Sequence, residues 1–191
     1  MTGINPEFLL QAYQMGIFPM AMGEGEIGWF SPDPRGVIPL ESFHVPKSLK
    51  RVIKAGRFEV RINHAFGEVL DGCADREETW IDETVRESYM HLHARGDAHS
   101  VECWSEGQLA GGLYGVAIGG AFFGESMFSR QCDASKVALA YLSNYLLRRR
   151  FSLLDTQWTT PHLRRFGAID MPKAQYMRAL RKAIESEVSF A

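Results

Sequence analysis

A single carboxylate lies within an apolar stretch near the end of an expected strand. It is Glu125, in the string GESMFS, and its apolar neighbours are Phe122, Phe123, Met127 and Phe128. Strand alternation places Glu125 on the same face as Phe123 and Met127, where a carboxylate is costly unless it is paired or used. One interpretation is a group that handles a substrate. The alternative is a solvated strand end, or an ion pair with an arginine such as Arg130.

Two polar residues end a short apolar strand that is expected at 152–157. Asp155 and Gln157 lie two residues apart in LLDTQ, so strand geometry points both side chains to the same side. Together they can orient a substrate amine, a proton or a carbonyl group. The alternative is that one of them bonds the backbone of the turn before Thr160.

Basic residues form a one-sided stripe on a short expected helix. Lys47, Lys50, Arg51 and Lys54 follow i, i+3, i+4, i+7 spacing, and Arg57 extends the run. Such a stripe without acids can contact phosphates, at roughly one salt-sensitive charge per residue. The alternative is a solvated helix face.

The composition is that of a globular protein. The length of 191 residues predicts one domain, or one domain with a small appendage, and 46% hydrophobic and 23% charged residues are ordinary globular values. These values exclude a disordered tail, a collagen-like chain and a disulfide-packed toxin. A net charge of -2 excludes a globally basic nucleic-acid binder. Three widely spaced cysteines, no secretory signal and no apolar run of about 18 residues predict a cytoplasmic protein without a membrane span.

The order of the expected elements predicts the fold. Helices are expected at residues 6–15, 46–55, 63–74, 82–95 and 133–149, from 160 and from 172, and strands at 58–63, 99–105, 108–118, 120–128 and 152–157. Residues 16–39, which include four prolines, are expected to form an ordered loop. This order predicts an α+β fold with a central mixed sheet and helices on both faces. It is also the order of the GCN5-related N-acyltransferase fold, in which two central strands splay apart and open a cleft.

Motifs for metals, phosphates and coenzyme A are missing. His91 and His93 lie two apart on an expected helix and face about 200° apart, so they cannot share an ion. The glycines of GGLYGVAIGG lie in expected strands, which excludes a P-loop or Rossmann motif. An acetyl-CoA enzyme of this fold needs a glycine-rich pyrophosphate loop before its long helix, where this chain has FSRQCDASK. The residues therefore predict no coenzyme A site, and His91 and His93 do not form a metal site.

Several strings in combination resemble one family, the leucyl/phenylalanyl-tRNA–protein transferases of bacteria. They cover nearly the whole chain: LLQAYQMGIFPM (9–20), WFSPDPRGVIPLESFHV (29–45), GCADREETWI (72–81), HSVECW (99–104), GGLYGVAIGGAFFGESMFSR (111–130), DASKVAL (133–139) and LLDTQWTTPHLRRFGA (153–168). The fold of this family is similar to a GCN5-related acyltransferase. Longer members have an additional N-terminal segment, so we expect residues 1–40 to form a reduced N-terminal subdomain and residues 41–191 the catalytic domain.

The resemblance implies an aminoacyltransferase, specifically a leucyltransferase. Such enzymes take Leu or Phe, and also Met, from aminoacyl-tRNA and form a peptide bond with the α-amino group of a protein that begins with Arg or Lys. The product is directed to N-end-rule degradation. Because the tRNA ester is already activated, the resemblance implies no metal and no cofactor. It implies aminoacyl-tRNA and acceptor proteins as partners, and we expect a monomer.

By motif position, the resemblance also assigns residues. Glu125 is expected to hold the substrate α-amino group, while Asp155 and Gln157 are expected to orient and deprotonate the attacking amine. The amino-acid pocket is expected at Leu113, Phe122, Met127, Leu142 and Leu154. Stacking on the terminal adenosine is expected from Trp80, Trp29 and Phe30. The residues expected to bind the acceptor stem of tRNA are Lys47, Lys50, Arg51, Lys54 and Arg57.

Two other functions stay open from the residues alone. One is an acetyl-CoA-dependent acetyltransferase of the same fold, against which the missing pyrophosphate loop counts. The other is a non-catalytic RNA-binding module. That module agrees with the basic stripe, but it leaves Glu125, Asp155 and Gln157 without a role.

Overall fold

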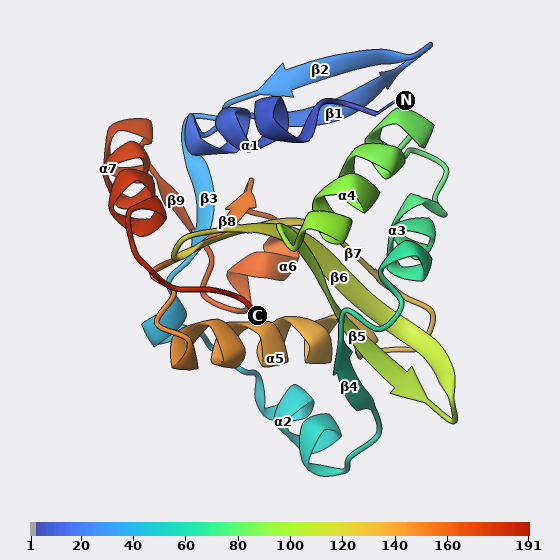
Figure 1. The fold of residues 1–191 in the computed structure, drawn as a ribbon. Helices are drawn as coiled ribbons and strands as arrows, with labels where there is room; N and C mark the ends of the chain where they lie inside the picture. Colours follow the sequence, from blue (N-terminus) through green and yellow to red (C-terminus); the bar gives the residue numbers. More distant parts are fainter. Residues whose placement is uncertain (1–2) are drawn as a thin grey trace.

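A computed structural model describes residues 3–191, which form a small two-stranded sheet and a large sheet flanked by helices (Figure 1). The N-terminal part contains α1 (Pro6–Gln14), β1 (Phe18–Gly23), β2 (Glu26–Phe30), β3 (Arg35–Ile38) and a 3-10 turn (Leu40–Ser42). The middle part contains α2 (Lys47–Lys54), β4 (Glu59–Ile62), α3 (Phe66–Ala74), α4 (Glu83–Arg95), β5 (Ala98–Ser105) and β6 (Gln108–Ile118). The C-terminal part contains β7 (Ala121–Ser129), α5 (Ala134–Arg148), β8 (Leu153–Gln157), α6 (Pro161–Arg164), β9 (Ile169–Met171) and α7 (Lys173–Ile184).

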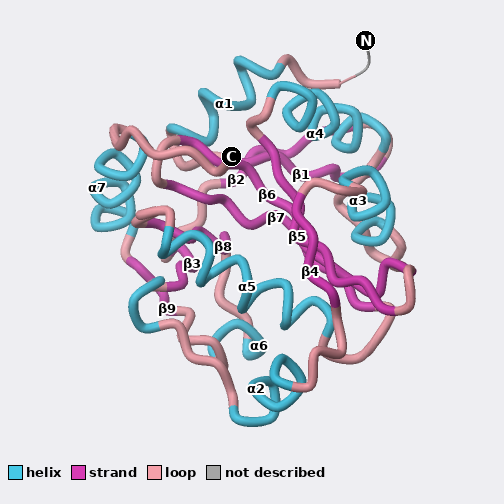
Figure 2. Tube along the Cα trace, turned by 60° about the horizontal axis from the view of Figure 1, so that its bottom comes forward, coloured by secondary structure: helices cyan, strands magenta, loops and turns pink. Residues whose placement is uncertain are grey.

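The large sheet has the strand order β4-β5-β6-β7-β8-β3-β9. Only β7 and β8 pair in parallel among these neighbours; the other pairs within the described residues are antiparallel. Helix α5 packs on one face, and α3 and α4 pack on the other (Figure 2). The predicted mixed sheet with helices on both faces is confirmed, as is the antiparallel meander of β5, β6 and β7.

The segment that was expected to be a loop, residues 16–39, instead contains a hairpin and a strand. Strands β1 and β2 pair in the small sheet, with Pro19 opposite Trp29. Each strand of a two-stranded sheet has an unpaired edge, so a proline is tolerated there although it excludes a helix. Strand β3 belongs to the large sheet, between β8 and β9. The division into residues 1–40 and 41–191 stays a prediction.

Helix α4 begins and ends where its sequence predicts. The Asp82 side chain accepts the backbone N–H of Val85 at 2.8 Å, which satisfies one free donor of the first turn. Gly96 follows the helix in the left-handed region, with φ 86°, as a glycine can without strain. Both signals act within a few residues, which explains why they can be read from the sequence.

Helix α3 begins differently from the sequence expectation, in which Asn63 caps it. The Oδ1 atom of Asn63 accepts the backbone N–H of Ser100 at 3.0 Å, so this side chain joins β5 rather than the helix. The buried carboxylate of Glu102 instead accepts the backbone N–H groups of His64 and Ala65, at 2.9 and 2.8 Å. A side chain from a neighbouring strand therefore satisfies the donors that precede the helix.

No helix formed by residues 3–191 combines the length and the apolar composition that crossing a bilayer requires.

Candidate active site

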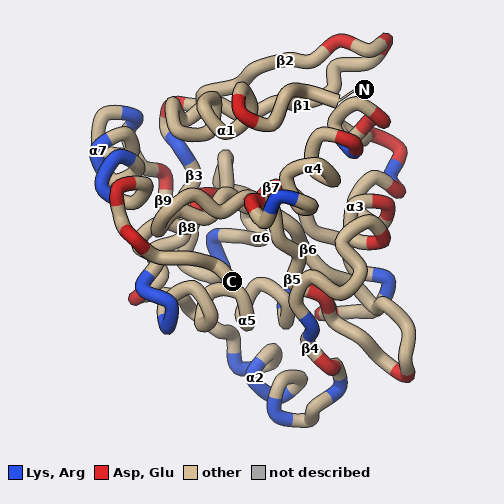
Figure 3. The backbone as a smooth tube through the Cα atoms, in the orientation of Figure 1, with Lys and Arg blue, Asp and Glu red and all other residues tan. Residues whose placement is uncertain are grey.

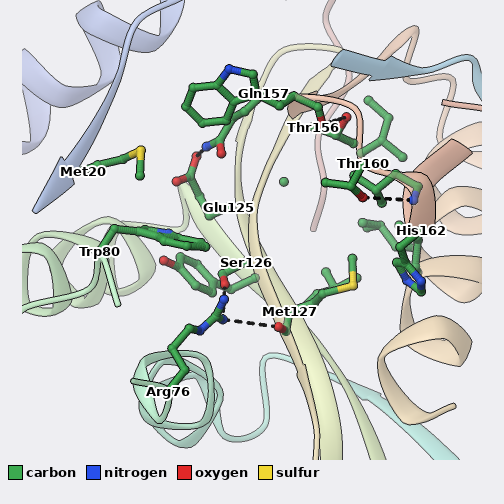
Figure 4. Close-up of a pocket in the computed structure, with 18 residues that line it drawn as sticks. Met20, Arg76, Trp80, Glu125, Ser126, Met127, Thr156, Gln157, Thr160 and His162 are labelled. Carbon is green, nitrogen blue, oxygen red and sulfur yellow. Dashed lines mark hydrogen bonds between the residues drawn. The ribbon is translucent and has the colours of Figure 1, made fainter. Parts of the chain in front are cut away.

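Strands β7 and β8 run in parallel and part beyond their last paired residues. Their pairing ends at Phe123 and Asp155. A cavity of about 310 Å³ lies beyond this point, and its lining includes Glu125 of β7 and Gln157 of β8 (Figure 4). The expectation that two central strands diverge and open a cleft is confirmed.

A β-bulge at Glu125 determines which side chains of β7 face the cavity. The β6–β7 register shifts between Tyr114 and Gly115, which leaves Glu125 without a residue opposite it on β6. One extra residue reverses the alternation of the residues that follow. Phe123 therefore lies in the core, where its ring packs against Tyr13 of α1, while Met127 lines the cavity on the α5 side. The expected shared face is therefore wrong for Met127, whereas Phe123 and Glu125 both contact Tyr13.

The Glu125 carboxylate is 8% exposed and accepts three hydrogen bonds. Its Oε1 atom accepts the Tyr13 hydroxyl at 2.7 Å and Nε2 of Gln157 at 3.0 Å, and its Oε2 atom accepts the Tyr89 hydroxyl at 3.0 Å. Burial raises the pKa of Glu125 to about 7, because the hydrogen bonds, which lower it, only partly offset the loss of hydration, and the Asp155 charge raises it further. The group therefore changes its charge close to neutral pH.

The partners of Glu125 differ from both alternatives left open by the sequence. The carboxylate is neither solvated nor paired with Arg130, whose Nη1 atom lies 3.4 Å from a backbone carbonyl oxygen. Tyr13 and Tyr89, whose hydroxyls also hydrogen-bond each other, come from α1 and α4. They are 112 and 36 residues from Glu125, so no local pattern marks them.

Asp155 and Gln157 have different surroundings. Asp155 is fully buried, does not line the cavity, and accepts the backbone N–H of Gln157 on Oδ1 at 2.7 Å. This is a backbone-bonding role of the kind that the sequence left open. Gln157 lines the cavity and donates to Glu125. Of the expected pair, only Gln157 presents its side chain to the cavity, and Asp155 supports it from behind.

The cavity has an apolar wall that agrees largely with the expected amino-acid pocket. Four of the five expected residues line it: Leu113, Met127, Leu142 and Leu154. Leu139 of α5 and Leu163 of α6 complete this wall. Phe122 does not line it. Its ring is fully buried on the α5 side and packs on Phe190, with centroids 5.4 Å apart, so it contributes to the core.

The three aromatic residues expected at the terminal adenosine are separated in space. Trp80 lines the cavity. Trp29 packs edge-on against Phe8, at 5.3 Å between centroids, and does not line it. Phe30 packs against Phe18 and also lies outside the lining. The β1–β2 hairpin reaches the cavity through Met20 instead.

Arg76, Trp158 and His162 also line the cavity, and none of the three had been assigned a role. Arg76 lies over the Trp80 ring, 4.7 Å from its centroid, and Figure 4 shows both on the opposite side of the cavity from His162. Burial and the nearby cations lower the pKa of His162, which favours its neutral form. Trp158 lines the cavity next to Gln157 and is 41% exposed. Trp80, Arg76 and His162 come from strings that the resemblance covers, but spacing alone does not place them together.

The basic stripe lies on α2 and the residues that follow it, where Figure 3 shows Lys and Arg positions close together. All five of its members are exposed: Lys47, Lys50, Arg51, Lys54 and Arg57. Leu49 is the buried residue of this helix, which packs against α5. Acidic residues gather elsewhere, on the β1–β2 turn and between α3 and α4. Within residues 3–191, no group of three or more His, Cys, Asp or Glu side chains is arranged to hold a metal ion.

The mixed sheet, with its parallel strands parted over an apolar cavity that has a carboxylate and an amide at its edge, fits the acyltransferase class. The family "Leucyl/phenylalanyl-tRNA protein transferase" matches residues 37–181, and the N-terminal domain of the same family matches residues 3–33. The chain belongs to the leucyl/phenylalanyl-tRNA–protein transferase family.

Named relatives agree over almost the full chain. The leucyl/phenylalanyl-tRNA–protein transferase of Rubrobacter xylanophilus is 52% identical over 189 residues, which cover 98% of this chain and 99% of the relative. That of Akkermansia muciniphila is 53% identical over 189 residues, with 96% and 98% covered. That of Ruegeria pomeroyi is 51% identical over 190 residues, with 98% and 90% covered.

Solved structures show weaker likeness. L-PGS from Bacillus licheniformis superposes with a TM-score of 0.48 at 10% identity, over 82% of this chain and 54% of that one, so this chain spans about half its length. A ribosomal-protein-alanine N-acetyltransferase from Brucella melitensis superposes with a TM-score of 0.41 at 14% identity, over 56% of this chain and 85% of that one.

Proposed function

We propose that the cavity between β7 and β8 holds the aminoacyl end of a charged tRNA while its amino acid passes to an acceptor protein. The amine of an N-terminal Arg or Lys attacks the ester carbonyl carbon. A peptide bond forms, the ester bond to the tRNA ribose breaks, and the proton lost by the amine ends on the released ribose hydroxyl. The product is a protein that begins with Leu, Phe or Met and enters N-end-rule degradation.

Glu125 binds the donor α-amino group in this proposal. A buried carboxylate that is already held by two tyrosines and one amide needs a cation or a proton, and the donor supplies an ammonium group. Gln157 orients the reacting groups by hydrogen bonding, because an amide cannot usefully accept a proton. Asp155 acts through Gln157, since its own carboxylate does not line the cavity.

The attacking amine needs only weak help to lose its proton. An α-amino group has a pKa of about 7.7, so a large fraction is uncharged near pH 7.5. Orientation of the neutral amine beside the ester therefore supplies much of the required rate enhancement.

The walls of the cavity fit the donor. The side chains of Leu113, Met127, Leu142 and Leu154 form an apolar surface that accepts Leu, Phe or Met. Trp80 stacks on the terminal adenine in this proposal, opposite the ring face covered by Arg76. The stripe on α2 binds phosphates of the acceptor stem, and such contacts do not read the anticodon.

The single observation that supports this function best is the hydrogen bond between Gln157 and Glu125 at the point where β7 and β8 part. The test is transfer of labelled Leu or Phe from charged tRNA to a peptide with an N-terminal Arg. Free amino acid as donor, and a peptide that begins with Ala as acceptor, are the controls. Label on the Arg peptide only with charged tRNA is the expected result. Equal transfer to the Ala peptide contradicts the acceptor, and no transfer by folded protein contradicts the reaction.

Acetyl-CoA is not the donor in this proposal. At the start of α5, where such an enzyme binds the pyrophosphate, the Ser129 hydroxyl accepts the backbone N–H of Ser135 at 3.0 Å. The segment 128–136 contains no glycine that would let a phosphate approach the backbone. Saturable binding of acetyl-CoA in calorimetry would contradict this part of the proposal.

We also infer that the protein acts as a monomer in the cytoplasm, where charged tRNA and newly exposed protein N-termini meet. Sedimentation equilibrium at micromolar concentration tests the monomer. A mass of 21.5 kDa is expected for the chain, and twice that mass contradicts the inference.

A further inference from the structure

The string WFSPDPR ends at Arg35, a buried cation that the proposed reaction does not use. Its side chain is 1% exposed. Nε lies 3.0 and 3.1 Å from the two carboxylate oxygens of Asp155, and Nη2 lies 2.9 Å from Oδ2. Nη1 donates to the carbonyl oxygen of Gly16 at 2.9 Å. The guanidinium lies between the rings of Phe18 and Tyr176, 4.7 and 4.9 Å from their centroids.

Arg35 therefore joins segments that are distant in sequence. Gly16 and Phe18 belong to the N-terminal segment, Tyr176 belongs to α7, and Asp155 belongs to β8. A fully desolvated cation in a two-point pair, with a ring on each side, has very little freedom to move. The carboxylate that it holds is fixed to the same degree.

The Asp155 carboxylate in turn holds the backbone of Gln157 in place. Its Oδ2 atom accepts the Tyr176 hydroxyl at 2.5 Å, and its Oδ1 atom accepts the backbone N–H of Gln157 at 2.7 Å. Gln157 has φ 65°, in the left-handed region that residues other than glycine adopt only when their surroundings hold them there. In this conformation its Nε2 atom lies 3.0 Å from Oε1 of Glu125.

Strand β3 approaches the turn at Gln157 and Trp158 closely. Gly36 of β3 is opposite Gln157, and a Cβ atom on Gly36 would lie 2.4 Å from the carbonyl carbon of Trp158. Two contacts thus constrain the turn at Gln157 and Trp158. One is the ion pair of Arg35 with Asp155, and the other is the close backbone approach of Gly36.

We propose that Arg35 and Tyr176 are positioning residues for the transfer reaction. They hold the Asp155 carboxylate where it maintains the left-handed backbone of Gln157, and that backbone directs the Gln157 amide to Glu125. This inference rests on the proposed function for Gln157 and Glu125. Through Tyr176 and Arg35, helix α7 contributes to a reaction in a cavity that none of its residues lines.

A purely structural pair would produce a different pattern of defects. Loss of one partner of a buried ion pair leaves an uncompensated charge and destabilises the fold, whatever the site does. Positioning is therefore tested with Tyr176→Phe, which keeps the ring over Arg35 and removes only the hydroxyl that donates to Asp155. Tyr145→Phe is the matched control, because its hydroxyl donates to the Phe190 carbonyl oxygen at 2.6 Å, outside the cavity lining.

The expected result is a kcat for Tyr176→Phe that is about 3- to 10-fold below that of the native protein, as loss of one hydrogen bond predicts. KM for charged tRNA is expected to change less than 2-fold, since Tyr176 touches no substrate. The Gln157 hydrogen bond lowers the pKa of Glu125, so a loosened Gln157 moves the acid limb of the kcat/KM profile to higher pH. Tyr145→Phe is expected to match the native protein in kcat, in KM and in the pH profile of kcat/KM.

Two further variants separate this inference from the proposed function. Gln157→Leu is expected to lower kcat, and adding Tyr176→Phe to it is expected to have no further effect on kcat. If Gln157→Leu alone transfers at the native rate, the proposed role of Gln157 fails. If Gln157→Leu is slow, but Tyr176→Phe transfers at the native rate or slows the double variant by the same factor as the single one, the positioning inference is overturned.

Arg35→Lys tests the ion pair between Arg35 and Asp155. It keeps the charge and loses the two-point geometry, because an ammonium group cannot reproduce the guanidinium fork. A kcat at least 10-fold lower in protein that remains folded supports the proposal. Native kcat in this variant overturns the role of Arg35.

Discussion

Replacing Glu125 by Gln removes one buried charge and leaves the shape of the site almost unchanged. The new side-chain oxygen can still accept from Tyr13 and Gln157, which both bond Oε1 in the native protein. The new amide nitrogen can donate to the Tyr89 hydroxyl, which then donates to Tyr13 through the hydrogen bond between the two phenols. Each of the three native hydrogen bonds therefore keeps a counterpart, and only the second N–H of the new amide has no partner among these residues.

The size of the expected effect on stability follows from the pKa of Glu125. The unfolded chain releases this proton near pH 4.5 and the folded protein releases it near pH 7. Between these values the folded state binds more protons, so the free energy of unfolding falls as the pH rises. At about 1.4 kcal/mol per pKa unit, the loss across this window is about 3 kcal/mol.

Glu125→Gln is therefore expected to be more stable than the native protein at pH 8, by up to about 3 kcal/mol, and equally stable near pH 4.5. For a chain of this length, that difference corresponds to a rise in Tm of roughly 6–12 °C. The same variant is expected to lose about 10- to 150-fold in kcat/KM for charged tRNA. A hydrogen bond to a charged group is worth about 1.5–3 kcal/mol, and this interaction with the donor ammonium is lost.

The assay is thermal unfolding from pH 4.5 to 8.5, paired with the rate of labelled Phe transfer over the accessible part of that range. Glu102→Gln is the control, since Glu102 is also a fully buried glutamate. Each of its oxygens accepts an N–H group that can only donate: Oε1 accepts the backbone N–H groups of His64 and Ala65, and Oε2 accepts Trp104 Nε1 at 3.0 Å. A Gln side chain there therefore brings two donors together. It is expected to be less stable by about 1–3 kcal/mol at every pH. A Glu125→Gln variant whose stability follows the native pH dependence would refute the reasoning.

Three further predictions concern the basic stripe on α2, the apolar wall of the cavity and the three cysteines. Lys50→Ala combined with Arg51→Ala is expected to raise KM for charged tRNA without changing kcat, and to lower the slope of log affinity against log salt by about two; an unchanged slope contradicts the role of the stripe on α2. Leu142→Phe narrows the apolar wall, so kcat/KM is expected to fall more for phenylalanyl than for leucyl donors, which competition between the two labels measures. Only Cys132 of the three cysteines is exposed, so a thiol reagent is expected to modify one cysteine in native protein and three after denaturation, and two fast-reacting thiols in native protein would disagree with the fold.

Local signals account for the parts of the fold that were predicted correctly. The start and end of α4 at Asp82 and Gly96, and the turns at 106–107 and 119–120 between the strands of the meander, depend on residues within one or two turns of the chain. The segment 16–39 was read as a loop because its prolines exclude a helix. The sequence could not show that Pro19 would lie in a strand of a small two-stranded sheet, where an unpaired edge tolerates a proline.

The candidate site was predicted in part. Glu125 and Gln157 stand out in the sequence because a polar group in an apolar strand costs free energy unless it is paired or used. Both residues line the cavity. Phe122 was assigned to the wall and lies in the core, whereas Trp158 and His162 had no assignment and line the cavity. Phe122 lies opposite Leu154, where β7 and β8 are still paired, and Trp158 and His162 lie beyond the end of β8, so only the tertiary arrangement decides which of them meets the cavity.

The sequence by itself determined the order of most elements, the polar residues to consider and, through its motifs, the family. The tertiary structure alone decided how those residues act together. The bulge that turns Glu125 exists only in the pairing of β6 with β7, and Arg35 meets Asp155 across 120 residues of chain. Contacts of this kind form when distant segments pack together, so local spacing in the sequence does not predict their geometry. Burial strengthens the electrostatic attraction and the hydrogen bonds between such groups.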